Sequence, residues 1–197
     1  MSNPQMEQAV RGEFAARVEE AMGGWAGSTV PGFNDVKPNK PRVETLLDQV
    51  HCDRIQTFVV QNLSRTTTTD AVIGELEQLG CGDFDFLRMP ISNGDQLFRG
   101  FAVINFSDPA AASRFIYAVE GRVFAGGSER ALVEIGVKQG VMANLDAINW
   151  TRRRRKNTHV CDKRGAGANG APFVRLGGQL RQILTHSDVE AARIVYG

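Results

Sequence analysis

Two short, mostly apolar segments of the chain contain an aromatic ring and a side-chain amide. Residues 99–106 read RGFAVINF, in which Arg99 and Gly100 precede the ring of Phe101. Residues 58–63 read FVVQNL and carry the amide of Gln61. A ring can stack on the flat face of a nucleobase, and a basic groove can follow the phosphates. These residue types are suited to non-covalent binding of unpaired nucleotides.

A run of basic side chains offers a second kind of chemistry. The whole chain has a net charge of only +1. Residues 53–138 hold 8 basic and 11 acidic residues, whereas residues 151–181 hold nine basic residues against Asp162 alone, a net of +8. Basic side chains neutralise phosphates without reading sequence, so this arm is expected to hold a nucleic-acid backbone. A solvated charge run and a nuclear-import signal are the alternatives. The side chains concerned are Arg152, Arg153, Arg154, Arg155 and Lys156.

The sequence contains no motif for catalysis. Serine, histidine and aspartate do not gather in a nucleophile motif, and no glycine loop matches a P-loop or a dinucleotide fingerprint. The cysteines, Cys52, Cys81 and Cys161, form no C-x-x-C pair, and the histidines beside them lack a second pair at zinc-site spacing. We expect free thiols, no metal, no cofactor and no enzymatic activity.

The segments that must position the ring alternate between strand and helix patterns. Runs of β-branched and aromatic residues predict strands at 57–63, 83–91, 97–106 and 131–137. Thr69 can cap a helix that ends at Gly80, and Asp108 with Pro109 can start a second helix that ends at Gly121. The order is β-α-β-β-α-β, which predicts an α+β, ferredoxin-like sandwich. Its four-stranded antiparallel sheet carries both helices on one face and leaves the other face bare.

Strand alternation assigns side chains to these two faces. The residues expected under the helices are Phe58, Val60, Ala102, Ile104 and Phe106. Those expected on the bare face are Val59, Gln61, Phe101 and Val103. Phe86 and Arg88 share one face of the second predicted strand. They either add a ring and a guanidinium to the bare face or belong to the core.

The two ends of the chain read as extensions of this domain. Val10, Phe14 and Val18 predict a short amphipathic helix over residues 6–22, and the Gly/Pro-rich residues 23–42 predict a linker. We therefore expect an N-terminal helix and flexible arm over 1–50 and the domain with a C-terminal helix over 54–150. A basic, Gly-rich extension follows over 151–197, with a flexible segment at 165–178 and a terminal helix over 184–197. The sequence shows no secretory signal or membrane-span pattern, which predicts an intracellular protein of the nucleus, the cytoplasm or both.

Residues 58–63 and 99–106 resemble the paired motifs of the RNA-recognition-motif (RRM) family. FVVQNL resembles the first-strand hexamer, and RGFAVINF resembles the third-strand octamer at most of its positions. Within that family, DFLRMPI, FAVINF, KQG at residues 138–140 and VMANLDAINW resemble the C-terminal RRM of the mei-two-like proteins. Val59 and Val103 stand where the family usually has aromatic residues, which implies weaker or differently distributed binding.

The resemblance implies a post-transcriptional regulator that binds single-stranded RNA on the open sheet face. The implied RNA-binding residues are Val59, Gln61, Phe86, Arg88, Arg99, Phe101, Val103 and Lys138, together with the basic arm. No membrane and no small-molecule substrate is expected as a partner. The alternative is an RRM-fold module that binds a protein partner and has little or no RNA affinity.

Overall fold

The computed structural model describes residues 40–92, 97–124, 126–154 and 170–197, and it describes residues 40, 52, 53 and 149–154 by their backbone alone. The helix predicted over residues 6–22 and most of the predicted linker lie outside the described residues. In chain order the elements are α2 (Lys40–Asp53), β1 (Thr57–Gln61), α3 (Thr69–Gln78), β2 (Phe86–Arg88), β3 (Ala102–Asn105), α4 (Pro109–Val119), β4 (Leu132–Ile135), α5 (Val141–Arg154), β5 (Phe173–Leu176), β6 (Gln179–Gln182) and α6 (His186–Tyr196).

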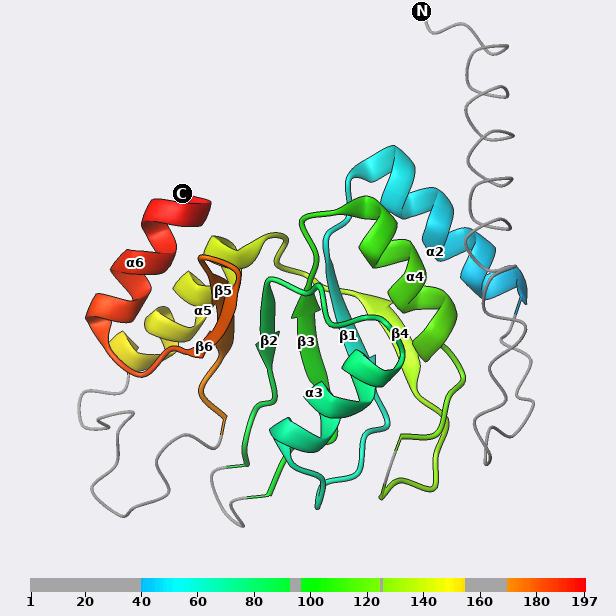
Figure 1. Cartoon of the computed structure of the whole chain (residues 1–197). Coiled ribbons are helices and arrows are strands. Elements are labelled where there is room, and N and C mark those ends of the chain that lie inside the picture. Colours follow the sequence, from blue (N-terminus) through cyan, green and yellow to red (C-terminus); the bar gives the residue numbers. More distant parts are fainter. Residues whose placement is uncertain (1–39, 93–96, 125, 155–169) are drawn as a thin grey trace, which may run out of the picture. The chain divides into compact units, whose positions relative to one another are not determined.

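The sheet is larger than the sequence predicts. From β1 to β4 the elements follow the expected β-α-β-β-α-β order, which confirms the α+β class and the antiparallel sheet. The sheet nevertheless has six strands, not four, in the order β4-β1-β3-β2-β5-β6. The two additional strands extend it beyond β2 (Figure 1).

Local sequence signals start the two central helices. Asp108 caps α4, because its carboxylate accepts hydrogen bonds from the backbone N–H groups of Ala110 (3.1 Å) and Ala111 (3.0 Å), and Pro109 follows as the first helical residue. The cap of α3 is Thr68, one residue before the predicted Thr69, and its hydroxyl accepts from the backbone N–H of Ala71. Both predicted helices are therefore confirmed.

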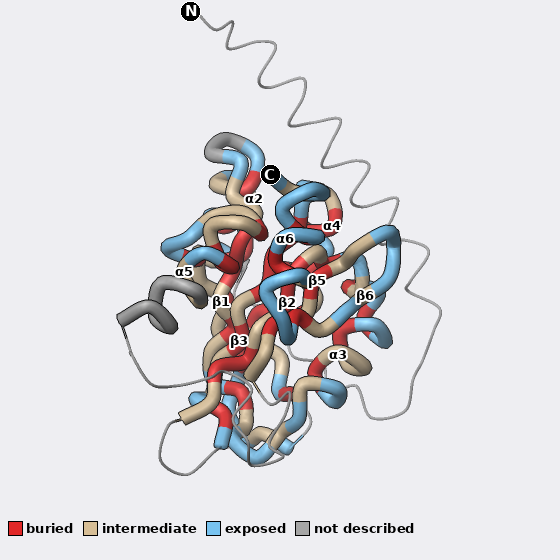
Figure 2. Tube along the Cα trace, turned by 90° about the vertical axis from the view of Figure 1, so that its left-hand side faces the viewer, coloured by how far each residue is buried: buried red, intermediate tan, exposed pale blue. Residues whose placement is uncertain are grey.

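The first face of the sheet packs against α3 and α4 around three phenylalanines. The ring centroids of Phe58 and Phe115 lie 5.7 Å apart, and those of Phe106 and Phe115 lie 4.9 Å apart. Figure 2 shows the buried stretches following the central strands and their facing helices. This core fixes the orientation of β1 and β3, and therefore which of their side chains reach the opposite face.

A third helix, α2, also joins this core and corrects the predicted boundary of the N-terminal arm. Val43, Leu46 and Val50 on α2 are buried in the same cluster as the phenylalanines. The Arg42 guanidinium donates to the carbonyl of Val133 on β4 at 2.6 Å. Residues 40–50 are thus part of the folded domain and not of a linker, because Pro41 in the first turn starts a helix and does not prevent one.

The C-terminal region corrects the predicted flexible extension. Residues 173–182 form a hairpin whose turn residues Gly177 and Gly178 both have positive φ, at 59° and 80°. Such a turn matches the twist of the paired strands and favours glycine. The helix predicted at the terminus is present as α6, capped by the Thr185 hydroxyl together with the Asp188 carboxylate. No helix in the described part of the chain is long and apolar enough to cross a membrane.

Cys81 is expected to resist alkylation in the native protein. Burial raises the pKa of its thiol from 9.0 to about 11, so the reactive thiolate is scarce at pH 8. Treatment with iodoacetamide at pH 8, followed by peptide mapping, should leave Cys81 unmodified until the protein is unfolded in urea. Rapid labelling of Cys81 in the native protein would show that the thiol is accessible and contradict this expectation.

Candidate nucleic-acid interface

The second face of the sheet carries the predicted outward side chains. Val59, Gln61, Phe101 and Val103 are all partly exposed. The residues predicted to lie under the helices are all buried, with 1% or less of their surface exposed: Phe58, Val60, Ala102, Ile104 and Phe106. The predicted alternation along β1 and β3 is therefore confirmed. Val59 pairs with Val103 across the two strands, which places the two missing ring positions side by side.

This face is not bare, because α5 and α6 cover the part of it over β2 and β5. A second apolar cluster contains Phe86 of β2, Leu145 of α5 and Val174 of β5. Val189 and Ala192 of α6 complete the cover, and Val103 packs against the edge of the same cluster. The prediction that the whole face is open is therefore wrong. The exposed part is the β4–β1–β3 end.

Phe86 is the site prediction that the structure corrects. Its ring is only 1% exposed and lies in the second apolar cluster, so it cannot stack on a base from solvent. Alternation left open whether Phe86 lies on the bare face or in the core. Its ring lies on the second face, where residues far along the chain cover it. Arg88, two residues later, is partly exposed and pairs with Val103. Lys138 is exposed just after β4.

A polar network fixes the start of α5 to the start of β1. The Gln139 side-chain oxygen accepts hydrogen bonds from the backbone N–H groups of Gln56 and Thr57, both at 2.9 Å. The Thr57 hydroxyl accepts from the backbone N–H of Gly140 at 3.0 Å and from the Asn144 amide at 3.3 Å. These bonds give the KQG segment a structural role and hold α5 in its place on the sheet.

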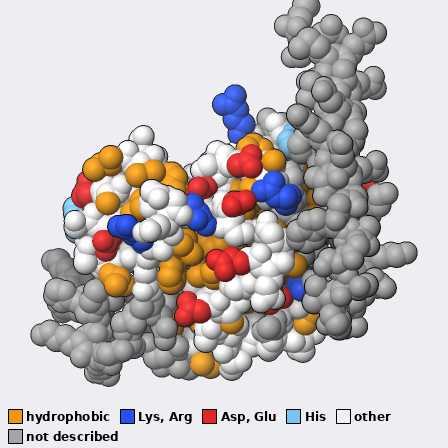
Figure 3. All heavy atoms as spheres, viewed as in Figure 1, with side chains coloured by type: hydrophobic (Ala, Val, Ile, Leu, Met, Phe, Trp, Pro, Cys, Tyr) orange, Lys and Arg blue, Asp and Glu red, His pale blue; other side chains and the backbone are white. Residues whose placement is uncertain are grey.

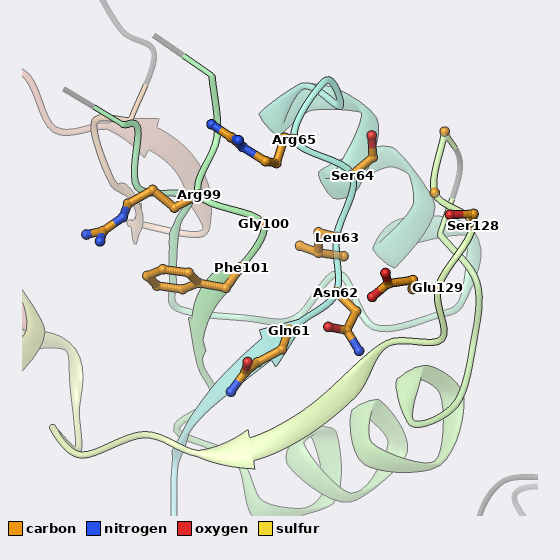
Figure 4. Close-up of a pocket in the computed structure, with 12 residues that line it drawn as sticks. Gln61, Asn62, Leu63, Ser64, Arg65, Arg99, Gly100, Phe101, Ser128 and Glu129 are labelled. Carbon is orange, nitrogen blue, oxygen red and sulfur yellow. The ribbon is translucent and has the colours of Figure 1, made fainter. Parts of the chain in front are cut away.

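A pocket of about 390 Å³ opens at the uncovered end of the face. Its lining includes three of the predicted binding residues, Gln61, Arg99 and Phe101. Figure 4 shows these three side chains and Arg65 extending to one side of the pocket. The remaining lining residues are Asn62, Leu63, Ser64, Gly100, Gly126, Gly127, Ser128 and Glu129.

Backbone hydrogen bonds hold the ring of Phe101 at this pocket. Gly100 has a φ of 82°, a conformation that favours glycine, and its carbonyl accepts from the backbone N–H of Leu63 at 3.0 Å. The Arg65 guanidinium donates to the carbonyl of Phe98 at 3.1 Å. These bonds attach the loop after β1 to the segment before β3. They fix the backbone that carries the Phe101 ring.

Sequence reasoning missed the loop residues of this pocket. Asn62 adopts a positive φ of 64°, and its side-chain amide donates to the Arg130 carbonyl at 3.0 Å. That bond ties the end of β1 to the loop before β4, which contributes Ser128 and Glu129. The only sequence signal was the polar character of the two loops, which marks an exposed turn without showing that the loops meet.

The charges around the pocket are mixed. Arg65 and Arg99 line it together with Glu129. The Gln61 amide also donates a hydrogen bond to the Glu134 carboxylate on β4. On the side of the molecule that carries α2, α3 and α4, which Figure 3 shows, acidic and basic side chains are interspersed. Among the described residues, no three His, Cys, Asp or Glu side chains gather as a metal site.

The basic arm falls largely outside the described side chains. Arg152, Arg153 and Arg154 belong to α5 by their backbone, and Arg155 and Lys156 lie outside the described residues. Arg175, which contributes to the predicted positive charge, has a structural role. Its guanidinium donates to the carbonyls of Phe84 and Gly178, at 3.2 and 2.9 Å, and lies over the Phe84 ring.

Comparisons with known proteins give partial likenesses to solved RRM structures. No protein-family model and no curated protein matches the chain. A Sxl-lethal protein/RNA complex is 23% identical, with a TM-score of 0.36, over 41% of this chain and 47% of that chain. The RRM of Rna15 with bound RNA (GU) is 11% identical, with a TM-score of 0.39, over 50% of this chain and 96% of that one. The first two RRM domains of yeast poly(U) binding protein (Pub1) are 12% identical, with a TM-score of 0.37, over 44% and 50% of the two chains.

The chain thus spans about half the length of the first and third of these proteins. TM-scores of this size carry no conclusion about family or function. Function is therefore inferred from the strand order, the exposed ring and the pocket of this chain.

Proposed function

We propose that the chain binds single-stranded RNA on the exposed β4–β1–β3 end of its sheet, as an RRM-type domain. The observation that carries the proposal is the partly exposed ring of Phe101 at a pocket that Gln61 and Arg99 also line. Aromatic rings on a sheet stack on splayed bases, and neighbouring polar groups bond to the base edges. A cation beside the ring can neutralise the adjoining phosphate.

The covered half of the face supports a short binding site. RRM sheets use aromatic residues of the two central strands to stack two or three bases. Here those positions hold Val59, Val103 and Phe101, and α5 and α6 cover the face from β2 outward. We therefore propose that one base stacks on Phe101 and that neighbouring nucleotides contact the pocket loops. Affinity from the sheet alone is correspondingly modest.

Titration of the full chain with labelled oligonucleotides tests this proposal. Fluorescence anisotropy with a set of unpaired eight-nucleotide RNAs should give saturable binding at low ionic strength. The affinity should fall steadily as salt is added. Binding releases cations from the RNA phosphates, and this release becomes less favourable as the salt concentration rises. If no RNA of the set binds at low ionic strength, the proposal is wrong.

The basic arm is proposed to hold the RNA backbone beside the pocket. For single strands, each neutralised phosphate contributes a slope of about −0.7 to the dependence of log affinity on log salt concentration. Replacing Arg152, Arg153, Arg154 and Arg155 together by alanine should make that slope shallower by roughly 1 to 3 and weaken binding at low salt. Arg114→Ala, which removes an exposed arginine of α4 paired with Asp83, serves as a control and should change neither quantity. An unchanged slope in the quadruple variant would exclude the arm from the site.

We propose a post-transcriptional regulatory role for this RNA binding, within the nucleus, the cytoplasm or both. The resemblance to the mei-two-like proteins supports such a role. Crosslinking in cells followed by sequencing of the bound RNA tests it. Recovery of a reproducible set of transcripts that depends on Phe101 is the expected result, and recovery of none would contradict the role.

Protein binding is the second candidate function, favoured by the covered half of the sheet. Phe86 lies within the chain's own second cluster and Val103 packs against its edge, so fewer face residues remain for RNA than in a bare sheet. A module of this kind would bind its partner with little dependence on salt or on Phe101. The salt titration described above, repeated with Phe101→Ala, distinguishes the two functions, because only RNA binding depends strongly on both salt and Phe101.

A further inference from the structure

A carboxylate stands on the same sheet face as the stacking ring. Glu134 lies on β4, where it pairs with Val59 of β1, and it is partly buried. Its carboxylate accepts a hydrogen bond from the Gln61 amide. Among the residues that the structure describes, no arginine or lysine pairs with it. A negative charge on a surface that binds a polyanion reduces affinity unless it accepts hydrogen bonds from the ligand.

The position of Gln61 connects this carboxylate to the ring. Gln61 lies on β1, between β4 and β3, and lines the same pocket as Phe101 (Figure 4). Neighbouring strands lie about 4.8 Å apart, so β4 and β3 are separated by roughly 10 Å. A purine stacked on the Phe101 ring would span part of this distance, and the Gln61 and Glu134 side chains would span the rest. The edge of such a base would meet the Gln61 and Glu134 side chains.

We propose that the Gln61–Glu134 pair selects guanine at the base position stacked on Phe101. The inference rests on the proposed RNA site and names the base that this site prefers. With one amide hydrogen of Gln61 donated to Glu134, the pair offers mainly oxygen acceptors to the ligand. Guanine carries two adjacent donors, N1–H and the N2 amino group, on its Watson–Crick edge, and bases in such sites are read on that edge.

The other three bases fit this acceptor pair less well. Uracil has a single donor between two carbonyl oxygens, and those oxygens would face the carboxylate. Adenine and cytosine each place a ring-nitrogen acceptor beside their amino donor. A bond from a neutral donor to a carboxylate is also stronger than one between neutral groups, so the carboxylate amplifies the difference between the bases.

The test uses seven-nucleotide uridine RNAs whose central position is guanosine, adenosine, cytidine, uridine or inosine. Inosine keeps N1–H and lacks the N2 amino group. The full chain should bind the guanosine RNA about tenfold or more tightly than the all-uridine RNA, with the inosine RNA in between. In Glu134→Gln the preference should fall to about threefold or less, while affinity for the all-uridine RNA stays equal or rises.

A matched control separates the base preference from a general effect of charge. Glu77→Gln removes an exposed carboxylate of α3, on the other face of the sheet and outside the residues that line the pocket. It should leave the guanosine preference intact. The inference is overturned if the native chain binds all five RNAs equally, or if Glu134→Gln keeps the full preference with an unchanged circular dichroism spectrum. A chain that binds none of the five RNAs would instead refute the proposed RNA site itself.

Discussion

Phe101→Ala is expected to weaken binding of single-stranded RNA by roughly tenfold to a hundredfold. Stacking of one base on an aromatic ring contributes about 1 to 3 kcal/mol. Each 1.4 kcal/mol corresponds to about a tenfold change in affinity. Phe101 is the ring that the exposed end of the sheet offers at the pocket, so its loss should not be offset by the valines at positions 59 and 103. Anisotropy titration at fixed salt concentration measures the change.

The control for this variant is Phe173→Ala. Phe173 is also a partly exposed phenylalanine, but it pairs with Leu87, which belongs to the helix-side core, so its side chain lies on the opposite face. Its replacement should leave RNA affinity within about twofold. Equal losses in both variants would show that the effect of Phe101→Ala is a general effect of removing a ring and not the loss of a stacking site.

Phe86→Ala is expected to lower the free energy of unfolding by about 3 to 5 kcal/mol, the usual cost of removing a fully buried phenylalanine. The ring lies between the sheet and the α5 and α6 cover, and its loss leaves a cavity among Leu145, Val174 and the other members of the cluster. Urea denaturation followed by circular dichroism measures the loss. Whole domains are stable by about 5 to 15 kcal/mol, so this variant is strongly destabilised.

The two phenylalanine variants should therefore have opposite profiles. Phe101→Ala should change the free energy of unfolding by about 1 kcal/mol or less, because its ring is partly exposed, while it reduces RNA affinity. Folded Phe86→Ala should retain most of its RNA affinity. If Phe86→Ala proves as stable as the native protein and loses RNA binding, its ring faces the ligand and the covered-face arrangement is wrong.

Much of the fold could be predicted from local signals. The Asp108–Pro109 pair starts α4 as expected, and strict alternation in 58–61 and 101–106 assigns each side chain to the correct face. Alternation works here because one face of each strand packs against large helix-borne side chains, so a shift by one residue would bury polar groups. The ring at position 101 and the amide at position 61 followed from this pattern alone.

The cover on the second face could not be predicted in the same way. The ambiguity at Phe86 depends on Leu145, Val174 and Val189, which lie about 60 to 100 residues further along the chain. Alternation reports the face of a side chain but not what is packed over that face. The adjacent glycines 177 and 178 are a hairpin signal, yet the surrounding Gly-rich composition favoured an irregular segment. The composition predicted an irregular segment and the glycine pair predicted a hairpin turn, and the structure contains the hairpin.

The hairpin β5–β6 also changes which strand forms the outer edge of the sheet. Without it, β2 would be an edge strand, and its unpaired backbone groups could pair with a strand of another molecule. The new edge, β6, is four residues long, and Gln179 and Arg181 are exposed along it. Short, polar edges oppose intermolecular strand addition. The same hairpin that extends the sheet thus protects the backbone groups of β2 from pairing with another molecule.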